Sequence, residues 1–287
     1  MLELEERADV TVVRLAHGKV NALDVELLRA IARAFGGLEP GRAVVFTGAG
    51  RAFSAGVDLK RIADGGMGYV RVFRPSLSAA VKAVFDHPGP VVAAINGHAI
   101  AGGCVLAAAC DMRLMSGGTI GLSEMRVGVP FPAVPLEVMR HLMGPAVRRL
   151  VWDAELLEPA AAQATGLIDE VVAPESLLDT ALAAAARLAR ISPEVFAYTK
   201  RQLQGPARDR LASVSQADED AATQMWASPA VLAAINGFMS GLKQQSPPGG
   251  RPRGASSVPP DSLPDERQDQ RAGQNQTELT HDYVTHE

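Results

Sequence analysis

Three separated segments of the chain carry residues whose types and spacing could do chemistry. Two of them, residues 51–60 (RAFSAGVDLK) and residues 95–104 (INGHAIAGGC), are small-residue turns that could each direct a backbone N–H group into one pocket. The third segment, residues 119–130 (TIGLSEMRVGVP), carries a lone carboxylate, Glu124. Two amide donors and one base are sufficient to stabilise the enolate of a thioester. The combination therefore predicts chemistry on an acyl thioester.

The composition sets the class of protein in which such a site would lie. With 287 residues, 47% of them hydrophobic, the chain can bury one large core or two modest ones. A formal charge of −4 gives no reason to expect nucleic acid or an acidic membrane surface as a partner. The two cysteines, Cys104 and Cys110, lie in one short apolar stretch, which predicts neither a disulfide framework nor a metal site. Residues 1–7 do not resemble a signal peptide and no apolar run could span a bilayer, so we expect a soluble, cytoplasmic protein.

Elements of two kinds alternate along the first part of the chain. Short apolar or β-branched runs, typical of buried strands, are found at residues 10–15, 43–46, 91–95 and 112–115. Patterns typical of helices follow them at residues 25–35 (with Asp24 as the N-cap), 69–85 and 103–109. This alternation predicts an α/β protein with parallel strands rather than an all-α or all-β fold.

The last third of the chain differs in character. Helical patterns dominate from residue 175 onward, at residues 175–189, 193–204, 208–225 and 229–242. Residues 244–287 are rich in Pro, Gly, Gln and Ser and carry four Arg against seven Asp or Glu. Such a segment cannot bury enough apolar surface to offset its ordering entropy, so we expect a disordered tail.

The three segments, in this order and spacing, resemble the crotonase (enoyl-CoA hydratase/isomerase) superfamily. The resemblance covers most of residues 10–243 and includes residues 21–23 (NAL) and residues 161–172 (AAQATGLIDEVV). It implies a crotonase-like spiral of ββα units, a C-terminal helical region, acyl-CoA as the ligand, and a homo-oligomer, either a trimer or a dimer of trimers. The expected organisation is a spiral core at residues 1–190, a helical trimerisation region at residues 191–243, and the tail at residues 244–287.

The resemblance also assigns an oxyanion hole. It implies that the amides of Val57 and Gly102 hold the thioester oxygen. Glycine in these turns lets the backbone approach a ligand closely, and each correctly placed donor lowers the barrier by about 2.7–4 kcal/mol. The residues expected to line the CoA and thioester region are Ala55, Gly56, Val57, Asp58 and Leu59. Asp58 is in addition expected to cap a short helix that begins at Leu59.

The number of catalytic glutamates differs between the branches of the family. Hydratases use two glutamates, and the first of these positions is occupied here by Val105, which cannot transfer a proton but should face the pocket. The second position is retained as Glu124. One carboxylate suffices for a 1,3-proton shift, and the residues around Glu124 are more similar to the Δ3,Δ2-enoyl-CoA isomerase branch. Phe131 and residues 65–78 are expected to shape the acyl pocket.

The favoured activity is therefore enoyl-CoA isomerisation, with no metal and no cofactor other than the coenzyme A carried by the substrate. One alternative is an enoyl-CoA hydratase of low activity that uses Glu124 and an ordered water. Another is a non-catalytic acyl-CoA-binding protein in which Val105 marks lost activity. The same oxyanion hole could also serve a decarboxylation or a C–C cleavage, because it accepts any acyl thioester.

Overall fold

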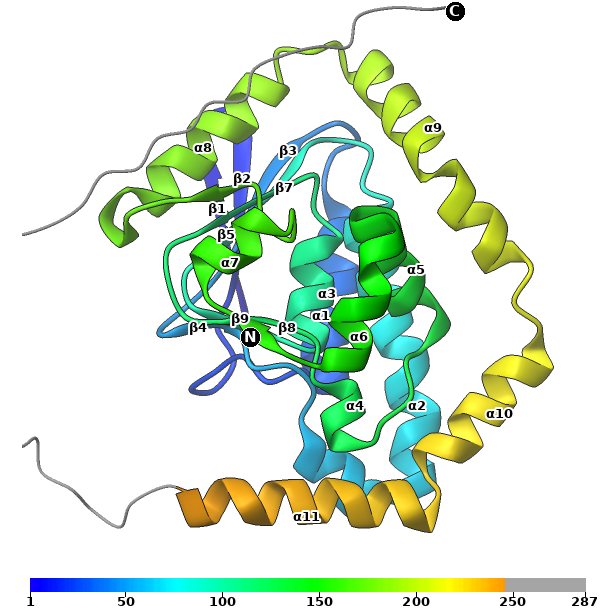
Figure 1. Ribbon diagram of the computed structural model, residues 1–287. Helices are drawn as coiled ribbons and strands as arrows, with labels where there is room; N and C mark the ends of the chain where they lie inside the picture. Colours follow the sequence, from blue (N-terminus) through cyan, green and yellow to red (C-terminus); the bar gives the residue numbers. More distant parts are fainter. Residues whose placement is uncertain (246–287) are drawn as a thin grey trace, which may run out of the picture. The chain divides into compact units, whose positions relative to one another are not determined.

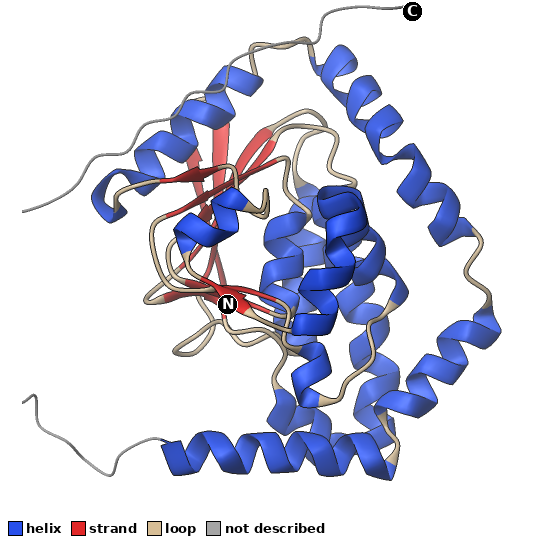
Figure 2. Ribbon diagram, in the orientation of Figure 1, coloured by secondary structure: helices blue, strands red, loops and turns tan. Residues whose placement is uncertain are grey.

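The computed structural model describes residues 1–245 of the chain, so that all but the first two residues of the predicted tail at 244–287 lie outside the described residues. A six-stranded sheet forms its centre in the order β1-β2-β3-β5-β7-β10 (Figure 1, Figure 2). Only β1 is antiparallel to its neighbour, and the other strands are parallel. The strands are β1 (Leu2–Arg7), β2 (Val10–Leu15), β3 (Ala43–Gly48), β5 (Val91–Ile95), β7 (Met112–Met115) and β10 (Glu170–Val171).

The apolar runs of the sequence form the inner strands of this sheet, because both of its faces are covered. Every residue of β3 and β5 is buried. Alternate residues, such as Val45 and Val92, pack against α8 (Leu177–Leu188), while their neighbours, such as Val44 and Phe46, face the main core. The four predicted inner strands are thus confirmed, and β1 and β10 extend the sheet at its two edges.

A second, four-stranded sheet has the order β4-β6-β8-β9. Its strands are β4 (Ala52–Ser54), β6 (His98–Ile100), β8 (Ile120–Gly121) and β9 (Leu156–Leu157). The first three are mutually parallel, and each lies within one of the three segments that carry the candidate chemistry. The carboxyl ends of parallel neighbours meet at one edge of a sheet. This small sheet therefore brings three segments that are distant in sequence to one place.

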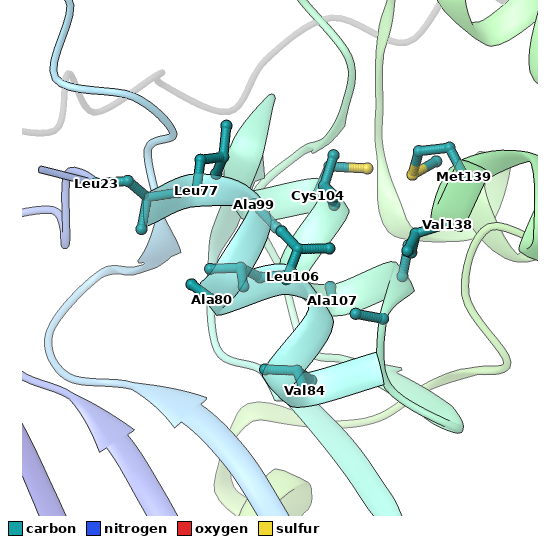
Figure 3. Packing of buried hydrophobic residues seen from close by; sticks show 14 of the residues in the cluster. Leu23, Leu77, Ala80, Val84, Ala99, Cys104, Leu106, Ala107, Val138 and Met139 are labelled. Carbon is teal, nitrogen blue, oxygen red and sulfur yellow. The ribbon is translucent and has the colours of Figure 1, made fainter. Parts of the chain in front are cut away.

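Helices fill the space around the two sheets. They are α1 (Val25–Gly37), α2 (Leu59–Phe85), α3 (Gly102–Ala108), α4 (Glu124–Val127), α5 (Ala133–Met143), α6 (Val147–Asp153), α7 (Pro159–Ala164), α8, α9 (Pro193–Ala212), α10 (Gln216–Trp226) and α11 (Pro229–Gln245), with short 3₁₀ turns at Gly144–Ala146 and Pro174–Ser176. Every residue of α3 is buried, and Figure 3 shows side chains of α3 packed among those of α2 and α5. No helix among the described residues is both long and apolar enough to cross a bilayer.

Two helix boundaries differ from the sequence-based prediction. The helix expected to begin at Leu59 with Asp58 as its cap is present, since the Asp58 side chain accepts from the Arg61 amide, but it is continuous with the helix predicted at residues 69–85, and the two together form α2. A kink at Gly66, whose φ is 50°, then lets the chain continue into the predicted helix. Helix α9 runs through Pro206 to Ala212 instead of ending at residue 204. The break comes at Ser215, whose side chain forms a capping box with Asp218 at the start of α10.

Candidate active site

A cavity of about 560 Å³ opens at the carboxyl ends of β4, β6 and β8. Each of the three sequence segments contributes to its wall, and the rest comes from α2, β9, α5 with the preceding Pro132, α10 and α11. Its lining residues are Ala55, Val57, Leu59, Leu77, Ile100, Ala101, Gly102, Val105, Ser123, Glu124, Arg126, Val127, Val129, Pro132, Pro135, Leu156, Trp226, Phe238 and Gly241. Most of these side chains are apolar, as is usual for a small-molecule site with a few polar groups that orient the ligand.

The turn after β4 presents one free amide to the cavity. Leu23 pairs with this turn as a short parallel bridge, in which its amide donates to the Gly56 carbonyl (2.8 Å) and its carbonyl accepts from the Asp58 amide (3.0 Å). The Gly56 amide is held by the Ser54 hydroxyl at 3.2 Å. The Val57 amide between them has no acceptor among the described residues. It is therefore available to a ligand.

Gly56 has to be a glycine for this turn to form. Its φ is 85°, and a Cβ atom at this position would lie 2.6 Å from the Ile100 carbonyl oxygen. This close approach joins the end of β4 to the end of β6. The turn therefore holds Val57 against the second segment of the site.

The turn after β6 supplies the second amide. Gly102 and Gly103 begin α3, so their amides have no carbonyl acceptor within the helix, and the N-cap residue Ala101 provides no side-chain acceptor. Ala101 itself has a φ of 50° and a ψ of −119°, a backbone conformation that costs an L-residue roughly 1–3 kcal/mol. Its amide is fixed by the Gly121 carbonyl at 2.8 Å. The strained turn thus directs the start of α3 into the cavity beside Val57.

Glu124 is the first residue of α4 and brings a carboxyl group to the same cavity. Although the residue as a whole is partly exposed, its Oε2 atom is buried and has no hydrogen-bond partner among the described residues. Burial raises the pKa of Glu124 to about 7, against the opposing effect of its own backbone amide and that of Ser123. A carboxylate with a pKa near neutrality is suited to remove and return a proton.

No second carboxylate lines this cavity within residues 1–245. Val105 occupies the wall near Gly102, and only 1% of its surface is exposed. The other polar side chains of the wall are Ser123, Arg126 and the indole of Trp226. The site therefore has one candidate base and no partner acid for it.

The structure brings most of the predicted site residues together. Ala55, Val57, Leu59, Gly102, Val105 and Glu124 all line the one cavity. Gly56 forms the turn and Asp58 caps α2, and neither of them lines the cavity. Phe131, which packs against the main core, does not line it either, and within the predicted segment 65–78 only Leu77 reaches the wall.

Helices α10 and α11 contribute three residues to the cavity that were not predicted from the sequence, namely Trp226, Phe238 and Gly241. Their local sequence does not indicate that they line a cavity, since each belongs to an ordinary amphipathic helix. A tryptophan is nevertheless uncommon in this chain, which has two. The buried one, Trp226, was the available signal.

Comparison with known proteins gives a consistent result. The family model described as enoyl-CoA hydratase/isomerase matches residues 5–245. A putative enoyl-CoA hydratase of Thermus thermophilus is 36% identical over 64% of this chain and 75% of the relative. The mitochondrial enoyl-CoA delta isomerase 1 of Homo sapiens is 26% identical over 85% of this chain and 84% of its own. The crystal structure of the human mitochondrial delta3-delta2-enoyl-CoA isomerase superposes with a TM-score of 0.81 at 25% identity, covering 86% of this chain and 99% of that one.

Proposed function

The chain belongs to the enoyl-CoA hydratase/isomerase family, and on that premise we propose that it is a Δ3,Δ2-enoyl-CoA isomerase with Glu124 as its single base. The observation that carries the proposal is the lone buried carboxyl of Glu124 in a cavity that also receives the amides of Val57 and Gly102. A 1,3-proton shift needs one group that takes a proton and gives it back. Hydration needs in addition a group that activates water.

The proposed reaction proceeds in two steps. The Val57 and Gly102 amides donate to the thioester oxygen while the Glu124 carboxylate removes a proton from C2 of a 3-enoyl-CoA, and the electron pair of the broken C–H bond delocalises into a dienolate. Glu124 then returns the same proton to C4, and the double bond moves to C2–C3. Each amide contributes about 2.7–4 kcal/mol by donating to the charge that develops on the oxygen. No atom is gained or lost, so a single base is sufficient.

Turnover of matched 3-enoyl-CoA and 2-enoyl-CoA substrates by wild type and Glu124→Gln tests this proposal. We expect fast isomerisation of the 3-enoyl substrate, a kcat lower by about 10²–10⁴ in the variant, and a kcat/KM that falls as the pH drops below about 7. Measurable hydration of the 2-enoyl substrate without isomerisation would favour the hydratase alternative, which the name of the Thermus thermophilus relative supports. Binding without turnover, unchanged by the substitution, would instead indicate a non-catalytic acyl-CoA-binding protein.

We further propose that the chain forms a homo-oligomer, a trimer or a dimer of trimers, through the helical region at residues 191–243. Three large apolar side chains of α9 are exposed, Val195 at 58%, Tyr198 at 57% and Leu203 at 66%. Val195 and Leu203 also line a second cavity, of about 500 Å³. Large apolar side chains exposed on one helix favour an interface with a partner, and a second copy of the chain is the partner proposed.

A further inference from the structure

The C-terminal helices close the end of the candidate active site that the three sequence segments leave open. Trp226, the last residue of α10, lines the same cavity as Val57 and Gly102, together with Phe238 and Gly241 of α11. Trp226 is only 2% exposed. Its indole is therefore an internal wall of the cavity rather than a surface feature.

Contacts on two sides hold the indole in place. Its Nε1 donates to the Pro130 carbonyl at 2.8 Å, which ties it to the loop that follows Glu124 and α4. Its ring lies 6.0 Å from the Phe73 ring at an interplanar angle of 34°, and Phe73 in turn stacks on Tyr69. A side chain with a fixed hydrogen bond and a packed ring face presents a rigid surface to a ligand.

The helix that carries the indole is itself fixed to α2. Arg74, whose side chain is 3% exposed, forms an ion pair with the Glu219 carboxylate at 2.8 Å and also donates to the Glu219 carbonyl at 2.7 Å. The same guanidinium donates to the Thr223 hydroxyl. Glu219 and Thr223 lie seven and three residues before Trp226, so the last two turns of α10 cannot move without breaking buried polar contacts.

Two residues of α2, Leu77 and Phe73, show how far the Trp226 indole lies from the amide donors along the cavity. A Cβ atom added to Gly102 would lie 3.9 Å from a terminal methyl of Leu77, so Leu77 marks the thioester end of the cavity. Phe73, which packs against Trp226, precedes Leu77 by four residues, a rise of about 6 Å along the helix. An acyl chain that extends from the thioester along α2 therefore meets the indole after a few carbon atoms.

We propose that Trp226 is a specificity-determining residue whose indole ends the acyl chamber and limits the length of the acyl group. The inference rests on the proposed binding of acyl-CoA but not on the proposed isomerisation. Apolar contact with each added methylene strengthens binding until the chain reaches the indole, beyond which a further methylene has no space. A smaller residue at position 226 extends the chamber toward α11.

The experiment measures the affinity of the full chain for butanoyl-, octanoyl-, dodecanoyl- and hexadecanoyl-CoA by calorimetry. These saturated thioesters cannot be isomerised, so binding is separated from turnover. In wild type we expect the affinity to rise with chain length and then to fall. In Trp226→Ala we expect the fall to move to longer chains, so that the affinity ratio of the longest to the shortest ligand rises at least tenfold, since misfitting a single methylene is worth about 10–200-fold.

Two further variants make the result independent of folding. Trp226→Leu keeps an apolar side chain in the core. Its dependence of affinity on chain length should shift toward longer chains, but by less than in Trp226→Ala. Trp152→Ala removes the other tryptophan, which is 69% exposed on α6 and does not line the cavity, and should leave the profile unchanged. Melting temperatures establish that each variant is folded.

Wild-type affinity that rises without a limit through hexadecanoyl-CoA would overturn the proposal without any variant. So would folded Trp226 variants that keep the wild-type profile. If wild type binds none of the four thioesters, this proposal fails together with the acyl-CoA assignment. If it binds them but does not isomerise a 3-enoyl-CoA, only the proposed reaction fails.

Discussion

At the scale of single residues, Glu124 illustrates how a catalytic group can oppose stability. Its carboxyl is buried and its Oε2 has no hydrogen-bond partner among the described residues, so ionising it in the folded protein is costly. The same burial raises its pKa from 4.5 to about 7, which is what a general base working near neutral pH requires. The site therefore gains a suitable base at the expense of folding free energy.

The pH dependence of stability provides a test of this trade-off. Because the pKa is higher in the folded than in the unfolded chain, Glu124 carries no cost while it is protonated in both states, below about pH 4.5. The cost grows as the pH rises to about 7 and is constant above, at roughly 3 kcal/mol from 1.36 kcal/mol per pKa unit. Glu124→Gln is neutral at every pH, so its melting temperature should exceed that of wild type above pH 7 and converge with it in acid.

Differential scanning calorimetry between pH 4 and pH 8 makes the comparison. Glu39→Gln removes an exposed glutamate and should show no such pH-dependent difference. A Glu124→Gln variant that is no more stable than wild type at pH 8 would mean that the Glu124 carboxyl is not desolvated.

The same scale shows what the sequence alone could predict of the site. The residue types of three short segments indicated the site, the resemblance to the family then assigned Val57, Gly102 and Glu124 within them, and all three line one cavity. Phe131 was expected to shape the pocket for its position close to Glu124, but it is not among the residues that line the cavity. Side-chain direction in a loop depends on packing, which spacing along the chain does not encode.

At the scale of elements, the site depends on three very short strands. β4, β6 and β8 have two or three residues each, too few to show a period in the sequence, and none of them was predicted. The longer strands at residues 10–15, 91–95 and 112–115 were predicted with their observed bounds, because runs of four to six mainly apolar or β-branched residues are typical of strands. The part of the fold that positions the chemistry was thus the part with the weakest sequence signal.

The turn between β6 and α3 stores backbone strain that can be measured. Ala101→Gly should relieve the cost of a φ of 50° at Ala101, roughly 1–3 kcal/mol, offset by about 0.4–1 kcal/mol of extra entropy in the unfolded chain. The net expectation is a stabilisation of about 1 kcal/mol, or an increase of roughly 2–4 °C in Tm for a chain of this size. Ala107→Gly, in the interior of α3, should instead lower the Tm. An Ala101→Gly variant that melts at or below the wild-type temperature would contradict the presence of strain.

At the scale of the whole molecule, the C-terminal helices decide both the depth of the site and the surface left for a partner. Helices α10 and α11 return to the cavity and contribute Trp226, Phe238 and Gly241, although more than 100 residues separate them from Glu124. Local patterns predicted these helices but not their path, since that path depends on the buried contacts of Arg74 with α10. The packing of α10 against α2, which is distant in the sequence, could not be predicted from a single sequence.

The exposed apolar side of α9 gives the prediction that belongs to this scale. Val195 is 58% exposed and lines the second cavity, and α9 is attached to its own chain by Lys200, whose Nζ forms an ion pair with Asp111 at 2.7 Å. A charge at position 195 does not remove this ion pair, but it places a carboxylate in the proposed interface, where a charge is costly to bury. Val195→Glu should shift the protein from oligomer to monomer in sedimentation-velocity experiments at micromolar concentration.

The matched control for this prediction is Arg201→Glu, an exposed position on α9 away from the apolar side. It alters the charge more than Val195→Glu does, so an unchanged oligomer in this variant would show that the position of the charge matters rather than its sign. A monomeric wild type would overturn the proposed assembly, and a Val195→Glu variant with wild-type sedimentation would place the interface elsewhere. Because Trp226 and Glu124 lie in a cavity built within one chain, the monomeric variant should still bind acyl-CoA, which separates the role of α9 in assembly from that of α10 and α11 in the site.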